Sequence, residues 1–383
     1  MSEKYYRDTV VDVDLDAIHE NYKMIQNLHR DKTFIAVIKA NAYGLGSVTV
    51  AEYLAARGVG FFAVATLDEA IELRMHGIRE KILVLGAIRP EDINKAIQHR
   101  IAVTAPNLDW VTKARENVSD KYDKEVWMHI KVNSGMNRLG TSNIEEINRM
   151  IEEIEGQGSF IYEGIYSHFS SADIDSEVND KEYAEFKRIT GAVKKPKYVH
   201  IQNSAGALRI SGDYCNAIRV GISLYGYYTS EYIEEISEVK LNPSVMLSTK
   251  VIDVHTLSAG EGVSYGLDHK AESTEKIATL PIGYADGLLR RHTGYKVRLQ
   301  NGTESPIVGR ICMDSAMISV PSDVKTGDEV TIISREADSE QSMESYSEHA
   351  QTISHESLTT LLRRIPRSYN GEDTAFVHNE VLK

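Results

Sequence analysis

The sequence predicts a two-domain α/β protein, in which an amino-terminal (β/α)8 barrel of the TIM type precedes a mainly β domain. Two observations lead to this prediction. In the first 225 or so residues, short runs rich in β-branched side chains alternate with amphipathic segments, which is typical of repeated βα units. After Tyr228, helical periodicity mostly ends and apolar residues alternate with polar ones in period two.

The predicted barrel strands are short apolar runs separated by helical patterns. Residues 67–77 illustrate such a pattern, because apolar residues recur three and four apart and a glycine ends the segment. The eight runs cover residues 34–39, 61–65, 82–86, 101–105, 126–132, 160–168, 198–202 and 216–220. Eight parallel strands with crossover helices close most economically into a barrel, and a doubly wound open sheet is the structural alternative.

The second domain is predicted from a series of alternating segments that begins at Ser244. An acidic stretch at 230–240 and then Pro243 are interpreted as a linker or edge element. Turn sequences such as Asn301-Gly302 separate the strands that follow. We therefore expect a barrel domain over residues 1–240 and a mainly β domain over residues 241–383, since 383 residues suffice for two cores.

Composition restricts the classes of partner. Apolar residues make up 42% and charged residues 26%, as in folded globular proteins, and the net charge of −13 disfavours nucleic acid or an anionic membrane as partner. The two cysteines, Cys215 and Cys312, form no disulfide framework, and no ligand cluster predicts a metal. The charged amino terminus lacks a signal-peptide core and no run of about 18 apolar residues occurs, so we expect a cytoplasmic protein.

Polar side chains stand where the predicted barrel strands end, which is where barrel enzymes build their active sites. Lys39 closes the first strand, and a lysine there needs a partner or a function to offset its burial. The other strand-end candidates are Arg138, His168, Asn203, Ser204, Arg219, Gly221 and Ile222. Loops after the seventh and eighth strands commonly bind phosphate in this fold. A lysine, a phosphate site and arginines on one rim suggest pyridoxal 5'-phosphate (PLP), a phosphorylated cofactor held as an imine.

Eight segments in order resemble the motifs of the alanine racemase family, particularly in staphylococci and bacilli. They cover nearly the whole chain: VIKANAYGLG, GMNRLG, SHFSSAD, IQNSAGAL, AIRVGISLYG, GVSYG, IGYADG and GRICMD. The resemblance implies a PLP-dependent homodimer that interconverts L- and D-alanine, a small-molecule amino-acid substrate, for cell-wall peptidoglycan. A single motif would be weak, whereas eight in order with fitting spacing are highly specific.

The resemblance also implies two catalytic bases. Lys39 would bind PLP as a Schiff base and act on one face of the substrate. Tyr265, supplied by the second subunit, would act on the other face, because a single base returns the proton to the side it left. Free tyrosine has a pKa of about 10, so Tyr265 needs positive charge nearby. Arg219 would face the pyridine nitrogen and disfavour its protonation, which limits transamination.

The remaining roles come from the same resemblance. Arg138 would bind the phenolic oxygen of the cofactor and the substrate carboxylate, which the backbone N–H of Met313 would also hold. His168 would support Arg219 and the ring, and Lys131 matches a position that is often carbamylated. The phosphate would be held by Tyr43, Ser204, Gly221 and Ile222, and Asn203 would be a further cofactor-binding residue. The substrate corridor would be lined by Asp173, Tyr284 and Arg290.

One residue departs from the family pattern. Relatives carry a tyrosine–glutamate pair ahead of a carboxy-terminal Pro-Arg, and here the pair is His355-Glu356 before Pro366-Arg367. The family tyrosine donates its hydroxyl to the phosphate. His355 can donate an N–H instead, and a phosphate dianion nearby should raise its pKa. We therefore expect tighter cofactor binding at low pH, unless the histidine is an exposed and harmless replacement.

Two other functions compete with racemisation. A barrel PLP decarboxylase for basic amino acids would place a carboxylate at the pyridine nitrogen and use a cysteine and an aspartate across the interface. Arg219 and Tyr265 disfavour the decarboxylase function. A non-catalytic PLP-carrier protein would consist of a similar barrel alone, which the second domain disfavours.

Overall fold

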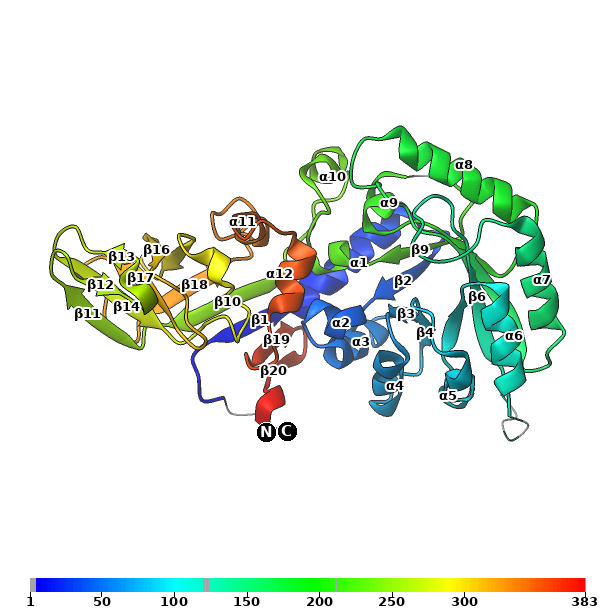
Figure 1. The fold of residues 1–383 in the computed structure, drawn as a ribbon, viewed down its shortest axis with the longest axis horizontal. Helices are drawn as coiled ribbons and strands as arrows, with labels where there is room; N and C mark the ends of the chain where they lie inside the picture. Colours follow the sequence, from blue (N-terminus) through cyan, green and yellow to red (C-terminus); the bar gives the residue numbers. More distant parts are fainter. Residues whose placement is uncertain (1–4, 120, 122–123, 211, 383) are drawn as a thin grey trace.

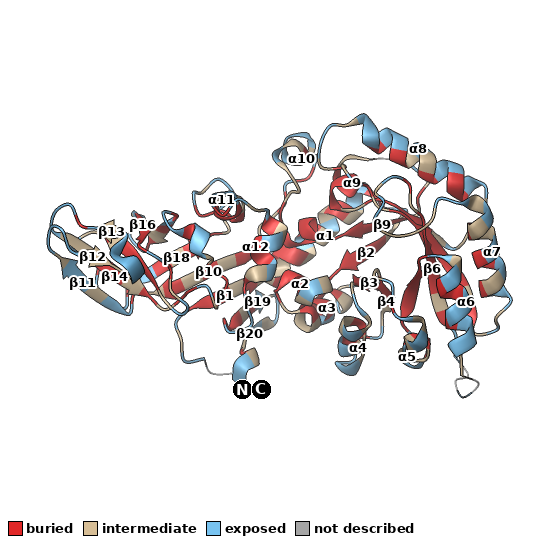
Figure 2. Cartoon of the chain, in the orientation of Figure 1, coloured by how far each residue is buried: buried red, intermediate tan, exposed pale blue. Residues whose placement is uncertain are grey.

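The computed structural model describes residues 5–119, 121, 124–210 and 212–382. Figure 1 shows two bodies side by side: a barrel of strands surrounded by helices, and an elongated β domain. The short helix α12 lies between the two bodies. Burial follows this arrangement, because the barrel strands, the inward faces of the helices and parts of the β-domain strands are buried (Figure 2).

The barrel sheet has eight strands, every hydrogen-bonded pair of them parallel. They run in the order β8-β7-β6-β5-β4-β3-β2-β9. Two backbone hydrogen bonds, Asn216 N to Val199 O and Arg219 N to Gln202 O, each 3.1 Å, connect the ends of this order. The strands are β2 (Thr33–Val37), β3 (Phe61–Val64), β4 (Lys81–Val84), β5 (Ala102–Ala105), β6 (Val126–Lys131), β7 (Phe160–Tyr166), β8 (Tyr198–His200) and β9 (Ala217–Val220). The barrel prediction is confirmed, and the open-sheet alternative is wrong because strand order never reverses.

The helices around the barrel form where capping residues and apolar spacing agree. In α7, Asn143 accepts hydrogen bonds from the first backbone N–H groups, and buried residues recur three and four apart. The segments are α1 (Leu15–Leu28), α2 (Lys39–Tyr43), α3 (Ser47–Ala55), α4 (Leu67–Met75), η1 (Pro90–Asp92), α5 (Ile93–His99), α6 (Leu108–Asn117), α7 (Ile144–Glu155), α8 (Glu177–Gly191), α9 (Ser204–Arg209), η2 (Ile222–Tyr225) and α10 (Glu231–Ile236).

The second domain is built on a ten-stranded sheet in the order β11-β14-β17-β16-β15-β18-β10-β1-β19-β20. Its strands are β1 (Val10–Asp14), β10 (Val245–Lys250), β11 (Asp253–Leu257), β14 (Glu275–Leu280), β15 (Lys296–Leu299), β16 (Glu304–Val308), β17 (Ala316–Val320), β18 (Glu329–Ile333), β19 (Arg367–Gly371) and β20 (Thr374–His378). The accessory elements are the pair β12 (Gly262–Val263) and β13 (His269–Lys270), the single turns η3 (Tyr265–Leu267), η4 (Arg290–His292) and η5 (Glu380–Leu382), and the helices α11 (Met343–His349) and α12 (Ser354–Thr360).

The first strand joins the second sheet, although the sequence assigned its segment to the barrel. β1 pairs antiparallel with β10 and parallel with β19. Val11 and Val13 are fully buried in this sheet, so the period-two pattern of VVDVD is the pattern of a β strand between two neighbours. Both ends of the chain therefore stabilise the β domain, and the barrel begins with α1.

None of the helices in the described part of the chain combines the length and hydropathy needed to cross a bilayer. Among those same residues, no group of three histidine, cysteine or acidic side chains is arranged to hold a metal ion.

Substitutions at two glycines test how closely the two bodies approach each other. Gly46 has a φ of +100°, and a Cβ atom there would overlap the hydroxyl oxygen of Tyr369 in β19. Gly58 has a similar φ of +94° but open space around it. We expect Gly58→Ala to cost about 1 kcal/mol through its left-handed backbone. Gly46→Ala should cost about 1–3 kcal/mol more because of the steric overlap. Thermal and denaturant unfolding of both variants measures the difference, and equal losses would contradict the close approach.

Candidate active site at the mouth of the barrel

Lys39 begins α2 directly after strand β2, at the carboxyl end of the barrel. Its side chain is half-buried. Burial lowers the pKa of the Lys39 ammonium, and the positive charges of Arg138 and Arg219 lower it further, while Glu69 opposes the shift. The amine is therefore more readily deprotonated than a surface lysine, which is what a nucleophilic amine requires.

The four residues after Lys39 form a left-handed turn without any glycine. Ala40, Asn41, Ala42 and Tyr43 have φ values of 52°, 56°, 51° and 56°. Left-handed helical backbone costs about 1–2 kcal/mol per residue for L-amino acids, so the surrounding structure has to compensate for this turn. Hydrogen bonds from Gly44 N to Ala40 O and from Gly46 N to Asn41 O, at 2.8 and 2.9 Å, supply part of the compensation.

The carboxylate of Glu69 fixes the start of this turn. One of its oxygens accepts a hydrogen bond from Ala40 N at 2.6 Å, and the other accepts from Ala65 N and Thr66 N at 2.7 and 3.1 Å. Thr66 and Glu69 also form a capping box that begins α4. One carboxylate thus joins the loops that follow two neighbouring barrel strands.

The carboxy-terminal strand β19 fixes the end of the turn. The buried guanidinium of Arg367 donates to Gly44 O at 2.9 and 3.1 Å and to Leu361 O, just after α12, at 2.6 Å. The hydroxyl of Tyr369 donates to Leu45 O at 2.8 Å. The lysine-bearing segment and helix α12 are therefore held by the same side chain of the second domain.

Arg219 lies in β9, almost completely buried, and keeps its charge. Burial lowers its pKa to about 10, so the guanidinium remains positive near neutral pH. It donates to Ser167 O at 2.7 Å and to the Nδ1 atoms of His168 and His200 at 3.2 and 2.6 Å. Both histidines accept from a cation, and burial, followed by the charge of Arg219, lowers the pKa of each well below 6.5.

The residues predicted to hold a phosphate meet where the last two strands end. Asn203 caps α9 by accepting from Gly206 N at 2.9 Å, and Ser204 Oγ accepts from Gly221 N at 2.9 Å. Ile222 is buried at the start of η2. Gly221 leaves room for Tyr43, because a Cβ atom at residue 221 would overlap the Tyr43 hydroxyl. The five predicted residues therefore form one compact group.

Lys131 and Arg138 belong to the same positive cluster. Lys131 ends β6, is buried, and donates to Val132 O at 2.8 Å. Burial, Arg219 and Arg138 together lower the pKa of Lys131 to about 7. Arg138 is exposed in the loop that follows β6, and its charge reaches Lys39, Lys131 and His168.

His355 lies in α12 and faces the cluster from the second domain. Its ring centre is 6.0 Å from that of Tyr43. Burial and, to a smaller extent, the charge of Lys39 lower the pKa of His355 to about 4, and Asp173 opposes the shift. The protein alone therefore holds His355 neutral, whereas the sequence led us to expect an imidazolium beside a bound phosphate.

The other predicted residues lie on the second domain. Tyr265 is 71% exposed in η3, between β12 and β13, which Figure 1 places at the end of the molecule away from the barrel. Tyr284 and Met313 are exposed on adjoining loops, joined by hydrogen bonds from Tyr284 N to Cys312 O and from Ala285 N to Met313 O, each 3.0 Å. Arg290 begins η4 beside a cavity that Asp268 and Arg310 also line. Within a single chain, these residues therefore lie away from Lys39.

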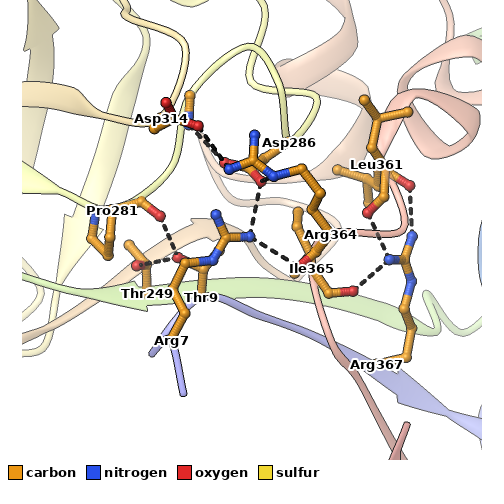
Figure 3. A network of polar contacts seen from close by, with 12 residues as sticks. Arg7, Thr9, Thr249, Pro281, Asp286, Asp314, Leu361, Arg364, Ile365 and Arg367 are labelled. Carbon is orange, nitrogen blue, oxygen red and sulfur yellow. Dashed lines mark hydrogen bonds and ion pairs between the residues drawn. The ribbon is translucent and has the colours of Figure 1, made fainter. Parts of the chain in front are cut away.

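A network around Asp286 holds the loops of Tyr284 and Met313 in place (Figure 3). The fully buried carboxylate of Asp286 accepts from Arg7 at 2.8 Å and from Gly283 N at 3.1 Å. Arg364 lies 3.7 Å from Asp286 and pairs with Asp314, next to Met313, at 2.7 Å. The amino terminus and the residues before β19 therefore support the loop that presents Met313.

Several residues that organise the site were not predicted from the sequence. Glu69 and Arg367 hold the turn that follows Lys39, His200 contacts Arg219 directly, and His129 lies behind His200. His129 and His200 each lie within a predicted barrel strand, which could have indicated polar side chains inside the barrel. No local signal marks the left-handed turn.

Fold and site together have the features of a PLP-dependent racemase: a barrel, a half-buried lysine with a lowered pKa, and a buried arginine near the ends of its strands. Family models described as "Alanine racemase, N-terminal domain" and "Alanine racemase, C-terminal domain" match residues 13–229 and 244–369. The alanine racemases of Macrococcus caseolyticus and Staphylococcus epidermidis are 50% and 48% identical to this chain over 383 residues, the full length of each protein. The crystal structure of alanine racemase from Bacillus anthracis with bound L-Ala-P is 38% identical, with a TM-score of 0.94 over 99% of this chain and 100% of that one.

The chain therefore belongs to the alanine racemase family and is a PLP-dependent amino-acid racemase. This membership supports the interconversion of L- and D-alanine as its reaction.

The charges around Lys39 make a prediction about its titration. Only the neutral amine is acylated, so the pH midpoint of Lys39 labelling in cofactor-free protein should lie below that of a surface lysine. Arg138→Ala removes a repulsive charge and should move the midpoint to higher pH, whereas Glu69→Gln removes an attractive one and should move it lower. Competitive acetylation with mass spectrometry measures both shifts. Arg149→Ala, on the exposed face of α7, is the control, and shifts of the same sign in all three variants would refute the assignment.

Proposed function

We propose that this protein interconverts L- and D-alanine with PLP bound at the barrel mouth, using Lys39 and the partner subunit's Tyr265 as two bases. The observation that carries the proposal is the position of Lys39: a half-buried amine with a lowered pKa, beside two arginines at the carboxyl end of the barrel. A lysine in such a place is activated to bind an aldehyde and later to move a proton.

The residues present fit PLP chemically. The amine of Lys39 is suited to the aldehyde, and the group formed by Tyr43, Ser204 and Gly221 is suited to the phosphate. Asn203, Ile222 and His355 complete that end of the site. The cofactor, when bound, withdraws electrons from the substrate and makes the hydrogen at its α-carbon acidic. Every other function in the reaction falls to side chains of the protein.

Two opposed bases explain why the products are enantiomers. Lys39 Nζ would take or give the α-proton on one face, and Tyr265 Oη would do so on the other. Tyr265 is 71% exposed and remote from Lys39 in its own chain, so it would serve the site of a second subunit. We therefore propose a homodimer in which neither subunit holds a complete site.

Arg219 decides which reaction is favoured. A permanent cation at the pyridine nitrogen would keep that nitrogen unprotonated, which weakens electron withdrawal and limits transamination. A decarboxylase of the barrel class would need a carboxylate in this place, and Arg219 instead has two neutral histidines and backbone carbonyls as partners. His168, which accepts from Arg219, would orient both the guanidinium and the ring.

Substrate binding would fall to Arg138 and to the backbone N–H of Met313 from the partner. We also propose that Lys131 is carbamylated, because an amine with a pKa of about 7 has a substantial neutral fraction near neutral pH and can add carbon dioxide. The carbamate would carry negative charge and anchor Arg138. Asp173, Tyr284 and Arg290 would line the entry corridor. The product D-alanine would be used in the cytoplasm to make precursors of peptidoglycan.

Subunit mixing tests the shared site. With PLP added, the protein should convert L-alanine into D-alanine and the reverse in a chiral assay, and Lys39→Ala and Tyr265→Phe should each lose nearly all of this activity. Mixing the two inactive variants should restore activity, because each heterodimer then contains one intact site. Lys39→Ala mixed with itself is the control. Demonstrated subunit exchange without recovery would rule out the shared site.

The pH dependence of cofactor binding tests His355. The pKa of His355 is about 4 in the protein alone and should rise when a phosphate dianion is bound. At pH values between the free and the bound pKa, PLP binding should therefore be accompanied by uptake of a proton. Affinity for PLP should then be higher at low pH and fall as pH rises through the pKa of the complex. His355→Tyr should abolish this dependence. Affinities measured from pH 5 to 9 that vary identically in both proteins would contradict the role of His355.

A further inference from the structure

A continuous series of hydrogen-bonded side chains passes through the interior of the barrel, behind Arg219. Arg219 Nη1 lies 2.6 Å from His200 Nδ1, and His200 Nε2 lies 3.0 Å from His129 Nδ1. His129 Nε2 lies 3.2 Å from Glu163 Oε2, and the other oxygen of Glu163 pairs with Lys81. Both histidines are fully buried and Glu163 nearly so.

The chemistry of the two ends fixes the direction of every bond in the series. A guanidinium only donates, so His200 Nδ1 must accept and its proton must be on Nε2. His129 then accepts through Nδ1 and carries its own proton on Nε2. That proton is donated to a carboxylate, which only accepts. The series therefore has a single consistent arrangement, with both imidazoles neutral and protonated on Nε2.

Burial agrees with this arrangement. It lowers the pKa of His129 as well as that of His200, which favours the neutral rings. Burial by itself would raise the pKa of Glu163, but the hydrogen bonds from His129 and Lys81, together with the positive charge of Lys81, outweigh it and lower the pKa.

The backbone is shaped to admit this series. The pairing of β6 with β7 shifts register between Met128 and His129, so that Glu163 is an extra residue in β7, as in a β-bulge. The bulge lets Glu163 reach the same interior as its neighbour Gly164. A Cβ atom at residue 164 would overlap the ring of His129, so only glycine leaves room for the imidazole. Tyr166 stacks on His200 with ring centres 4.9 Å apart and holds that ring in its plane.

Lys81 closes the series at the amino-terminal end of the barrel. Its ammonium lies 5.6, 5.3 and 5.2 Å from the ring centres of Phe61, Trp127 and Tyr198. These aromatic faces attract the cation and keep it beside Glu163. Its side chain is 22% exposed, so the pair is the one part of the series that approaches solvent.

We propose that Glu163, paired with Lys81, is a positioning residue for Arg219: through His129 and His200 it fixes the orientation and hydrogen bonding of the guanidinium that faces the cofactor ring. This rests on the proposed function of Arg219. Without a pure acceptor at the far end, either histidine could turn its proton to the other nitrogen, and Arg219 would then meet an N–H instead of a lone pair. A simple structural ion pair would require Lys81 and Glu163 but no ordered histidines between them and Arg219.

The tautomers of the two histidines are the first test, and they need no cofactor or activity. In full-length protein with 15N-labelled histidine, long-range 1H–15N correlation spectra should show His129 and His200 as neutral rings protonated on Nε2. His129→Gln and His200→Gln assign the signals. A proton on Nδ1 of either ring, or a doubly protonated ring, would overturn the proposal whether or not the protein is a racemase.

Glu163→Gln is the second test, because an amide can donate as well as accept. We expect a second His200 tautomer in its spectrum and a shifted absorption band of the PLP-loaded protein. We also expect a loss of about tenfold in kcat with little change in KM, as for other groups that support an active-site residue from behind. Lys81→Met, nearer the surface, should act in the same direction and serves if Glu163→Gln does not fold. Glu155→Gln removes a surface partner of Lys194 and is the matched control. Unchanged His200 signals and absorption in both Glu163→Gln and Lys81→Met would refute the role.

Discussion

The hydrogen bonds of Arg367 to the left-handed turn after Lys39 are the constraint on which the site depends. Four consecutive non-glycine residues in left-handed conformation would not persist without support from outside the turn. Arg367 and Tyr369 provide this support from the second domain, and Glu69 provides it from the barrel. The position of the Lys39 amine is therefore determined jointly by both domains, because neither domain alone contains all of its supports.

The same contact explains why helix α12 forms part of the site. Arg367 binds Gly44 O and Leu361 O at once, so the end of α12 and the lysine-bearing turn keep a fixed relation. Gly44 permits this approach, since a Cβ atom there would lie 2.7 Å from Leu358 O. His355 is brought beside Tyr43 as a result. The barrel mouth is thus completed by residues more than 300 positions later in the chain.

The mouth of the barrel is positively charged, although the molecule as a whole is negative. The chain has a net charge of −13, yet Lys39, Lys131, Arg138 and Arg219 gather at the carboxyl ends of the barrel strands. Burial lowers the pKa of both lysines, the positive charges of the two arginines lower it further, and a bound anion would relieve this repulsion. A phosphate and a substrate carboxylate are anions of the required kind. The cluster therefore favours the ligands of a PLP-dependent racemase and prepares its amines for reaction at the same time.

The sequence predicted the barrel strands and the residues at their ends because periodicity and strand ends are local properties. It did not predict β1 in the second sheet, since the pattern VVDVD fits a strand in either domain. The left-handed turn at Ala40–Tyr43 depends on contacts with Arg367, which no local pattern encodes. His129, His200 and Glu163 were missed because a polar residue within a strand is ordinarily interpreted as one that faces solvent, even where it points into the barrel. The proposed role of Tyr265 in a partner's site would depend on a second chain, which the sequence of one chain does not describe.

The most direct test of the account is to locate the covalent attachment of PLP. The loaded protein is reduced with borohydride, digested, and mapped by mass spectrometry for the pyridoxyl group. The account predicts one modified peptide, with the adduct on Lys39, and no adduct on Lys131, which is more deeply buried. An adduct on Lys131 or any other lysine, with Lys39 unmodified, would contradict the central claim that the left-handed turn presents the reactive amine.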